Sequence, residues 1–416
     1  MPMQTMRKRV ESLVNQTPVT DVHTHLHSPA FGDLLLRGFD ALLTYHYLVA
    51  EMFRWQRALP ADVFFSWPVR KQADLVWKTL FIDHSPVSES TRGVLTVLEA
   101  YGLDVAARDP KAYRSFFSKL DADAHIALAM KCANVETLVM TNDPFDLNEH
   151  ALWEQGMKPH PQFAAALRLD LLFLDWPSAV TKLRAMGFRV TSTMTEETHN
   201  ELRRFLLSWI DRMKPLYFMA SLPPEFIVPG NDIAAAIFED VVLPVAREQD
   251  LAFAIMLGCK RQINPDLRLA GDGVTEANLS MVEYLARTHA GNKFLLTVLS
   301  RENQHGAIVL ARKFRNILPF GCWWFVNSPM LVDEITRMRL EWLGLSMVPQ
   351  HSDARVLDQI VYKWRHFKEL LIAVLDEKYS AIEQSGWLVS DDELERDIAG
   401  LLGRTFWEFI GAKRHA

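Results

Sequence analysis

The chain has 416 residues, of which 49% are hydrophobic and 23% are charged, and its net charge is −6. This length suits one large barrel with an insertion or two to three ordinary domains, and the composition is that of a globular protein. The acidic balance argues against nucleic acid or an anionic membrane surface as a partner. No apolar run reaches transmembrane length, and the three scattered cysteines fit a reducing compartment, so we expect a cytoplasmic protein.

Short apolar segments of the β type recur along the chain, separated by helical patterns as in βα units. There are eight of them, at residues 18–23, 138–141, 163–169, 217–221, 251–257, 294–298, 317–325 and 345–348. Eight such units predict a (β/α)₈ barrel of the TIM type, although segment 163–169 contains three consecutive alanines and fits a helix equally well. Helical patterns lie at 232–248 and 275–288, and Pro244 should kink or end the first of them.

The interval between the first two segments is too long for a single crossover. Helical patterns fill it at residues 39–57, 73–81, 91–101 and 110–120. We expect residues 27–134 to be a helical insertion over the carboxyl ends of the strands, where a barrel of this type holds its active site. Residues 1–26 and 135–416 would then form the barrel, with further helical segments at 353–379 and 388–410.

Two histidines, His23 and His25, follow the first apolar segment. Side chains at positions i and i+2 of a strand point to the same face, so both imidazoles can aim at one point. Imidazole is the commonest metal-donating side chain, and two of them make half of a tetrahedral zinc-type site. Packing or surface roles are the alternative for this pair, because a short motif of this kind occurs often without a metal.

A carboxylate that can complete such a site stands at the end of the eighth segment, at Asp353. Strand eight lies beside strand one in a closed barrel, so Asp353 can meet both histidines. Alternatively, Ser352 or Asp353 caps the helix that follows. Arg355 can bind a carboxylate through its bidentate fork, or it can be a surface charge of the first helical turn.

Six sequence blocks occur in order along the chain. They are D-V-H-T-H-L at 21–26, Y-H-Y at 45–47, V-E-T-L-V-M-T-N-D-P at 135–144, R-L-D at 168–170, G-C-W-W-F at 321–325 and S-D-A-R at 352–355. Together they resemble the uronate isomerase (glucuronate isomerase) family of the amidohydrolase superfamily. One block departs from the family, because Leu169 stands where the family has proline.

The resemblance implies a (β/α)₈ barrel with a helical insertion and a single divalent metal, usually zinc, held here by His23, His25 and Asp353. It implies aldose-ketose isomerisation of a hexuronate, from D-glucuronate to D-fructuronate, from D-galacturonate to D-tagaturonate, or both. The expected ligand is therefore a small sugar acid, and the expected assembly is a homo-oligomer. Tyr47 corresponds to the active-site tyrosine of the family.

Met256 is the main departure from the family pattern. The family often has a histidine near the end of strand five, in a segment reading L-H-I-G-A, whereas this chain reads I-M-L-G-C at 255–259. This change keeps two alternatives open, a metal-dependent hydrolase or lyase acting on a related sugar acid and a non-catalytic barrel. Hydrolytic members of the superfamily usually draw on a histidine at strand six, and segment 294–301 has none, which favours the isomerase.

Isomerising a uronate moves a proton between C2 and C1 through an enediolate. The substrate carboxylate needs a cation, for which Arg168 and Arg355 are the candidates. The proton needs a base, and Tyr47, Asp353 or a metal-bound water can serve. Tyr47 can instead be an aromatic residue of an amphipathic helix, and Arg168 can instead form a structural ion pair.

Several other side chains near these blocks are candidates for supporting roles. We expect Trp324 to contact substrate, but adjacent residues on a strand point in opposite directions, so at most one of Trp323 and Trp324 should face the site. His27, His46 and His351 are expected to support the site from behind. Asp21 or Asp143 can orient a ligand imidazole.

Overall fold

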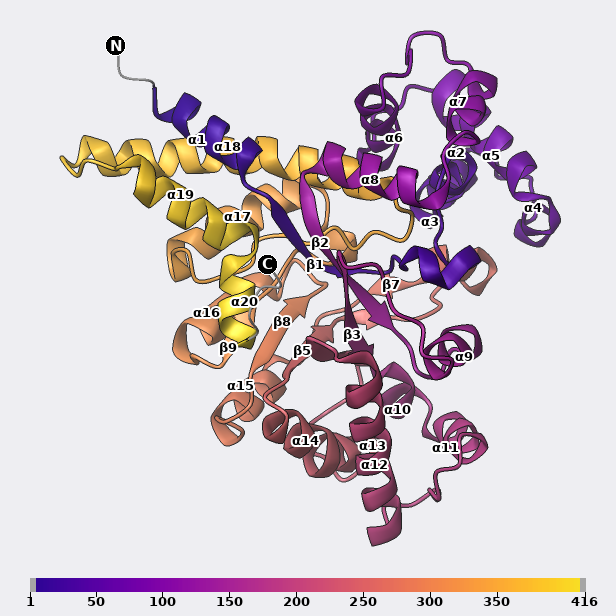
Figure 1. Ribbon diagram of the computed structural model, residues 1–416, viewed down its shortest axis with the longest axis vertical. Helices are drawn as coiled ribbons and strands as arrows, with labels where there is room; N and C mark the ends of the chain where they lie inside the picture. Colours follow the sequence, from indigo (N-terminus) through magenta and orange to yellow (C-terminus); the bar gives the residue numbers. More distant parts are fainter. Residues whose placement is uncertain (1–4, 412–416) are drawn as a thin grey trace.

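The computed structural model describes residues 5–411, and a parallel β-sheet curled into a barrel lies at its centre (Figure 1). The sheet has seven strands in the order β1-β2-β3-β4-β5-β8-β9. Their bounds are β1 (Val19–Thr24), β2 (Val135–Asn142), β3 (Phe163–Arg168), β4 (Tyr217–Ser221), β5 (Ala252–Leu257), β8 (Phe294–Val298) and β9 (Ile317–Pro319). All neighbouring pairs are parallel, as βα units require.

The eighth segment closes the barrel without forming a regular strand. On one side Val348 makes a single parallel bridge with Phe320. On the other side Asp353 N donates to His23 O at 3.2 Å, and His25 N donates to the carbonyl of Ala354 at 2.8 Å. The predicted (β/α)₈ barrel is confirmed, with its last strand reduced to a bridge.

Predicted and observed strands differ most at β9. Segment 163–169 is a strand, so its helical alternative is wrong. Strand β9 ends at Pro319 because the chain then leaves the extended conformation, with φ values of +66° at Gly321 and +45° at Trp324. A short 3₁₀ turn, η5 (Trp324–Val326), follows where the sequence predicted a continued strand.

The described chain between β1 and β2 is helical and forms the lobe at the upper right of Figure 1. Its elements are η1 (Pro29–Leu34), α2 (Phe39–Leu43), α3 (His46–Trp55), α4 (Ala61–Ser66), α5 (Val69–Trp77), π-helical η2 (Lys78–Ile82), α6 (Glu89–Ala100), α7 (Pro110–Phe117) and α8 (Ala122–Ala133). Helix α8 packs against β2 and α18 and therefore acts as the crossover into β2. The predicted helix at 39–57 is two helices, because the chain leaves the helical conformation at Tyr45.

Most of the remaining helices connect successive strands around the barrel. They are α9 (Leu147–Glu154), α10 (Asp170–Leu174), α11 (Trp176–Ala185), α12 (Glu196–Met213), α13 (Ile233–Ala236), π-helical η3 (Ile237–Val242), α14 (Leu243–Glu248), η4 (Pro265–Gly271), α15 (Leu279–Thr288), α16 (Gln304–Lys313) and α17 (Pro329–Leu343). A two-stranded hairpin, β6 (Cys259–Lys260) with β7 (Gly273–Val274), flanks η4 and was not predicted. Pro244 does not end its helix, which runs on to Glu248, because the π segment just before it widens the turn around a residue that lacks an N–H group.

The ends of the described chain pack together on the outside of the barrel. They comprise α1 (Met6–Gln16), α18 (Gln359–Gln384), α19 (Asp391–Ala399), π-helical η6 (Gly400–Arg404) and α20 (Thr405–Ile410). Helix α18 begins six residues after Asp353, so the N-cap role considered for Ser352 or Asp353 is wrong. From α20, Trp407 donates to Thr20 Oγ1 at 3.0 Å and packs with the side chains inside the barrel. The amino-terminal end of the barrel is thus covered, and the carboxyl end holds the site.

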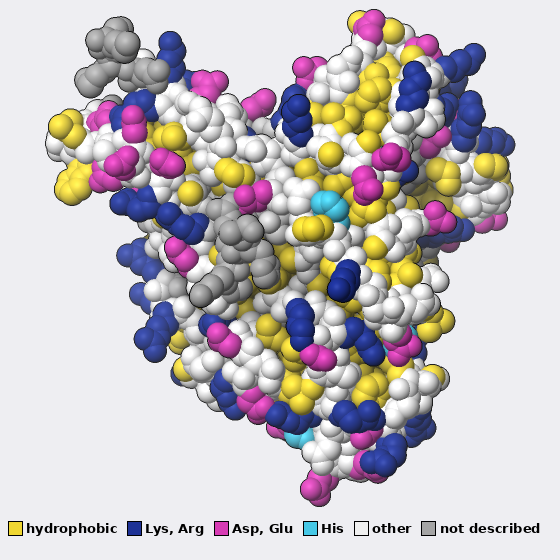
Figure 2. All heavy atoms as spheres, in the orientation of Figure 1, with side chains coloured by type: hydrophobic (Ala, Val, Ile, Leu, Met, Phe, Trp, Pro, Cys, Tyr) yellow, Lys and Arg dark blue, Asp and Glu magenta, His cyan; other side chains and the backbone are white. Residues whose placement is uncertain are grey.

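Charges of both signs are interspersed on the face shown in Figure 2, with no broad basic patch. This distribution agrees with the acidic balance of the sequence. Within residues 5–411 there is no helix whose length and apolar character would let it cross a bilayer.

Candidate active site

A small pocket lies at the carboxyl ends of the strands. Its walls are formed by His25, His46, Arg168, Ser221, Arg261, Trp323, Trp324, Asp353 and Arg355. Parallel strands end at the same edge of a sheet, so residues far apart in sequence meet here, and this is the edge where TIM-type barrels carry out their chemistry. His46 does not follow a strand; it comes from α3 in the helical lobe.

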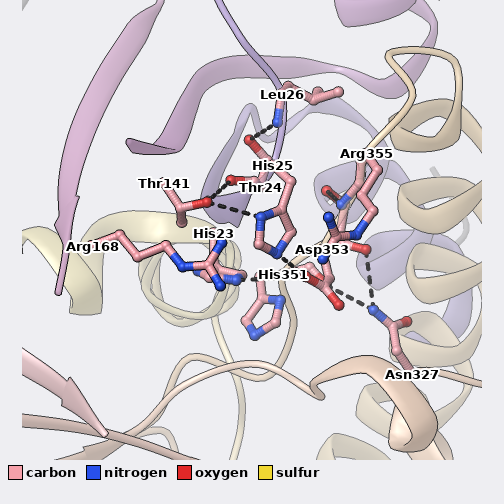
Figure 3. A network of polar contacts seen from close by, with 12 residues as sticks. His23, Thr24, His25, Leu26, Thr141, Arg168, Asn327, His351, Asp353 and Arg355 are labelled. Carbon is pink, nitrogen blue, oxygen red and sulfur yellow. Dashed lines mark hydrogen bonds and ion pairs between the residues drawn. The ribbon is translucent and has the colours of Figure 1, made fainter. Parts of the chain in front are cut away.

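His23, His25 and Asp353 face one another (Figure 3). Asp353 Oδ1 lies 3.5 Å from His23 Nε2 and 3.3 Å from His25 Nε2, and one donor atom from each residue lies within 4.8 Å of the others. His23 is fully buried, and neither its ring nitrogens nor Asp353 Oδ1 makes a hydrogen bond within the described residues. Unpaired buried polar atoms cost about 1–3 kcal/mol each, and a divalent metal would give all three residues a partner. The trio therefore fits a metal site.

Thr141 fixes the tautomer of His25. The Thr141 hydroxyl donates to Thr24 O at 3.0 Å, so its oxygen is left to accept from His25 Nδ1, also at 3.0 Å. With the proton on Nδ1, the Nε2 lone pair points toward Asp353, as a metal ligand requires. The sequence analysis missed Thr141, although it lies in the T-N-D-P block at the end of β2, the strand next to β1.

The protonation states of Asp353 and His25 suit metal binding. Burial alone would raise the pKa of Asp353, but the adjacent His23 and His25 outweigh it and hold that pKa well below its ordinary value. Burial, together with the charge of Arg355, lowers the pKa of His25 well below its ordinary value. A carboxylate and a neutral imidazole are the forms that bind metals.

Three guanidinium groups line the pocket, and two of them already have carboxylate partners. Arg168 pairs with Asp170 at 2.5 Å, which agrees with the alternative that it forms a structural ion pair. It also lines the pocket. Arg261, directly after β6, pairs with Asp272 at 2.7 Å. Arg355 has no ion-pair partner within 4.0 Å among residues 5–411. Arg355 is therefore the cation in this pocket that is free to bind an anion.

Tyr47 does not line the pocket, but its neighbour His46 does. The Tyr47 ring lies 4.7 Å from the His46 ring and stacks on Phe325 at 6.5 Å, measured between ring centroids. Burial raises the pKa of Tyr47 well above its ordinary value, so the phenol keeps its proton. Burial, followed by the charge of Arg355, lowers the pKa of His46 to about 3, so this imidazole is neutral. The Y-H-Y block contained both residues, but only the fold distinguishes them.

Both Trp323 and Trp324 line the pocket, so the expectation that at most one of them faces it is wrong. That expectation assumed an extended strand, whereas the chain here turns through η5 with Trp324 at φ +45°. Trp324 Nε1 is buried and has no hydrogen-bond partner in the described part of the chain. It is a donor available to a ligand.

The structure also gives the positions of Asp21 and Met256. Asp21 does not orient an imidazole; it accepts from Ser352 N and from Trp364 Nε1, each at 2.9 Å, and so anchors the eighth segment. Met256 is fully buried among the apolar side chains inside the barrel. The position where the family has a histidine is thus part of the core.

No protein-family model and no curated protein sequence matches the chain. Among solved structures, a uronate isomerase from Bacillus halodurans C-125 matches with a TM-score of 0.97 and 48% sequence identity, over 99% of this chain and 98% of that one. The chain belongs to the uronate isomerase family. The resemblance found in the six sequence blocks is thereby confirmed.

Two more distant members of the uronate isomerase family share the fold. A uronate isomerase from Thermotoga maritima matches with a TM-score of 0.77 and 15% identity, over 97% of both chains. A glucuronate isomerase from Caulobacter crescentus matches with a TM-score of 0.79 and 17% identity, over 99% of this chain and 95% of that one. The barrel architecture has therefore been kept while most of the sequence has changed.

Proposed function

We propose that this protein is a uronate isomerase that converts a hexuronate aldose into the corresponding ketose. The substrate is D-glucuronate, D-galacturonate or both, giving D-fructuronate or D-tagaturonate. The observation that carries the proposal is 48% identity to a uronate isomerase over 99% of the chain, with a His-His-Asp trio and an unpaired arginine in one pocket.

The residues that would hold the metal are His23, His25 and Asp353. Two imidazoles and a carboxylate with open coordination positions are a typical zinc donor set, so we propose zinc. When bound, the metal supplies Lewis-acid polarisation of a substrate oxygen. His25 Nδ1–H donates to Thr141 Oγ1, and this hydrogen bond keeps the His25 ring oriented with Nε2 toward Asp353.

The substrate carboxylate would pair with Arg355. Apart from Asp353 of the metal-binding trio, no carboxylate among the described residues competes for the Arg355 guanidinium. Arg168 Nε and Trp324 Nε1 are buried donors without hydrogen-bond partners in residues 5–411, and both belong to residues that line the pocket. Unpaired buried donors are costly, so we assign them to the hydroxyl and carboxylate oxygens of the sugar acid.

In the isomerisation, the C2–H and O2–H bonds break, and a C1–H and an O1–H bond form, so that the C1 carbonyl becomes a hydroxyl and C2 becomes the carbonyl. We propose Asp353 as the base that takes the proton from C2 and returns it to C1, since its carboxylate is ionised and lies in the pocket wall. Tyr47 keeps its proton but does not line the pocket, so we propose that it positions His46, whose ring lies 4.7 Å from its own.

The helical segment 27–134 is proposed to form the insertion over the catalytic face, with residues 1–26 and 135–416 as the barrel. The contribution of His46 to the pocket supports this division, because it comes from α3. We also propose a homo-oligomer, as the family resemblance implies, and a cytoplasmic location, which fits the three scattered cysteines. No observation favours a hydrolase or lyase, and the core position of Met256 gives such an enzyme no additional donor.

A uronate panel on metal-quantified protein tests the proposal. Protein prepared without chelators should contain about one divalent metal per chain, as in the sites of this donor type, and should form ketose from at least one hexuronate. His23→Ala and Asp353→Ala should lose both metal and turnover, whereas His305→Ala, at an exposed position in α16, should retain both. Absence of turnover with both uronates on metal-loaded protein would contradict the proposed activity.

A further inference from the structure

The backbone at Asp353 is strained. Its φ is +53°, in the left-handed region, which costs a non-glycine residue roughly 1–3 kcal/mol and persists only where the surroundings enforce it. Three hydrogen bonds already tie the segment to β1 and the residue after it. Asp353 N donates to His23 O, Ser352 N donates to Asp21 Oδ1, and His25 N donates to Ala354 O. The carboxylate position thus depends on how well the two preceding peptide groups are fixed.

Asn327 holds these two peptide groups from the opposite side. Its Nδ2 donates to His351 O at 3.1 Å and to Ser352 O at 3.2 Å, the two carbonyls just before Asp353 (Figure 3). Its Oδ1 accepts from Gln350 Nε2 at 2.9 Å. Asn327 is 5% exposed, so water cannot replace these bonds readily. One amide side chain therefore uses both of its ends to fix residues 350–352.

Asn327 also joins the two loops that carry pocket residues. It follows η5 directly, and its backbone N donates to Trp324 O at 2.9 Å. Trp324 itself has a φ of +45°, so both pocket loops contain a residue in the left-handed region. The Asn327 side chain and backbone link the two strained positions.

A buried charge pair supports Asn327 from behind. Lys363 Nζ donates to Asn327 O at 3.0 Å and pairs with Glu89 at 2.7 Å, and Lys363 is 5% exposed. A buried ammonium is retained only when it is paired, so this arrangement holds the Asn327 backbone firmly. Glu89 begins α6, so the chain of contacts runs from the helical lobe to the metal-binding trio.

We propose that Asn327 is a positioning residue that sets the geometry of the metal ligand Asp353. It touches neither the metal-binding atoms nor the pocket and acts through the carbonyls of His351 and Ser352. The inference rests on the proposed function for the identity of the metal site. Its test is metal affinity, measured without substrate.

The test compares Asn327→Asp with wild type by chelator competition for Zn²⁺. This change keeps the side-chain shape but replaces the two N–H donors by an acceptor. We expect Zn²⁺ affinity to fall by about 10- to 100-fold, the usual effect of losing a group that orients a metal ligand. Asn327→Ala, which removes the donors without adding charge, should weaken binding in the same direction and serves if the first variant does not fold.

Asn316→Asp is the matched control. Asn316 Nδ2 also donates to two backbone carbonyls, Ala286 O at 3.1 Å and His289 O at 3.4 Å, but at the start of β9 and away from the pocket. A purely structural role for Asn327 predicts lower thermal stability in both variants with unchanged Zn²⁺ affinity, and that result would overturn the inference. Lack of uronate turnover by wild type counts only against the proposed function, while failure of wild type to bind Zn²⁺ overturns both.

Discussion

Gly321 occupies a position where a methyl group has no room. Its φ is +66°, and an added Cβ would lie 1.8 Å from His351 Cδ2 and 2.4 Å from His351 Nε2. The His351 ring cannot easily move away, because it is fully buried and its centroid lies 4.9 Å from that of His23. We therefore expect Gly321→Ala to disturb the metal-binding trio as well as the stability of the barrel.

The size of the effect follows from two costs. A non-glycine residue at positive φ costs about 1–2 kcal/mol. Forcing a methyl group into a packed core costs about 1–3 kcal/mol more. Gly156→Ala isolates the first cost, because Gly156 has a φ of +75° and an added Cβ there would meet no atom within 4 Å.

Urea denaturation of both variants measures the difference. The free energy of unfolding should fall by about 1–2 kcal/mol in Gly156→Ala and by roughly 2–5 kcal/mol in Gly321→Ala. Zn²⁺ affinity, measured by chelator competition, should fall only in Gly321→Ala. Equal losses of unfolding free energy with unchanged metal affinity in both variants would refute the steric argument.

Three further predictions concern charge and metal. Arg355→Lys should lower kcat/KM by about 10- to 100-fold without changing metal content, since a bidentate charged pair is worth roughly 1.5–3 kcal/mol; near-normal kinetics would remove Arg355 from the site. Burial lowers the pKa of Lys368 from 10.5 to about 8. The free-energy cost of burying its charged ammonium therefore lowers the stability of the fold fully below pH 8, and this cost fades as the pH rises toward 10.5. Urea denaturation should therefore find Lys368→Met more stable than wild type at pH 7, by up to about 3 kcal/mol, and the gap should narrow at pH 10; a gap that is constant with pH would disprove the assignment. Removing the metal with a chelator should lower the Tm, because a ligand at 100 times its Kd stabilises by about 2.7 kcal/mol, and added Zn²⁺ should restore it; an unchanged Tm would count against a metal bound in the folded state.

The sequence determined those features that depend on local pattern. Eight apolar segments gave the barrel, and strand periodicity alone placed His23 and His25 on one face. Closure of a barrel then put Asp353 beside them, although the segment that carries it makes only one bridge. These predictions succeeded because strand alternation and barrel closure depend little on the particular side chains around them.

Only the tertiary structure decided which side chains reach the pocket. His46 enters the pocket from a separate lobe, and Trp323 joins Trp324 because the chain turns where a strand was expected. Thr141, on the neighbouring strand, contacts His25 from outside the pocket. The left-handed backbone of Asp353 likewise has no local sequence signal. Such conformations are unfavourable by themselves and are held by hydrogen bonds between residues far apart in sequence, so they can be recognised only once the chain has folded.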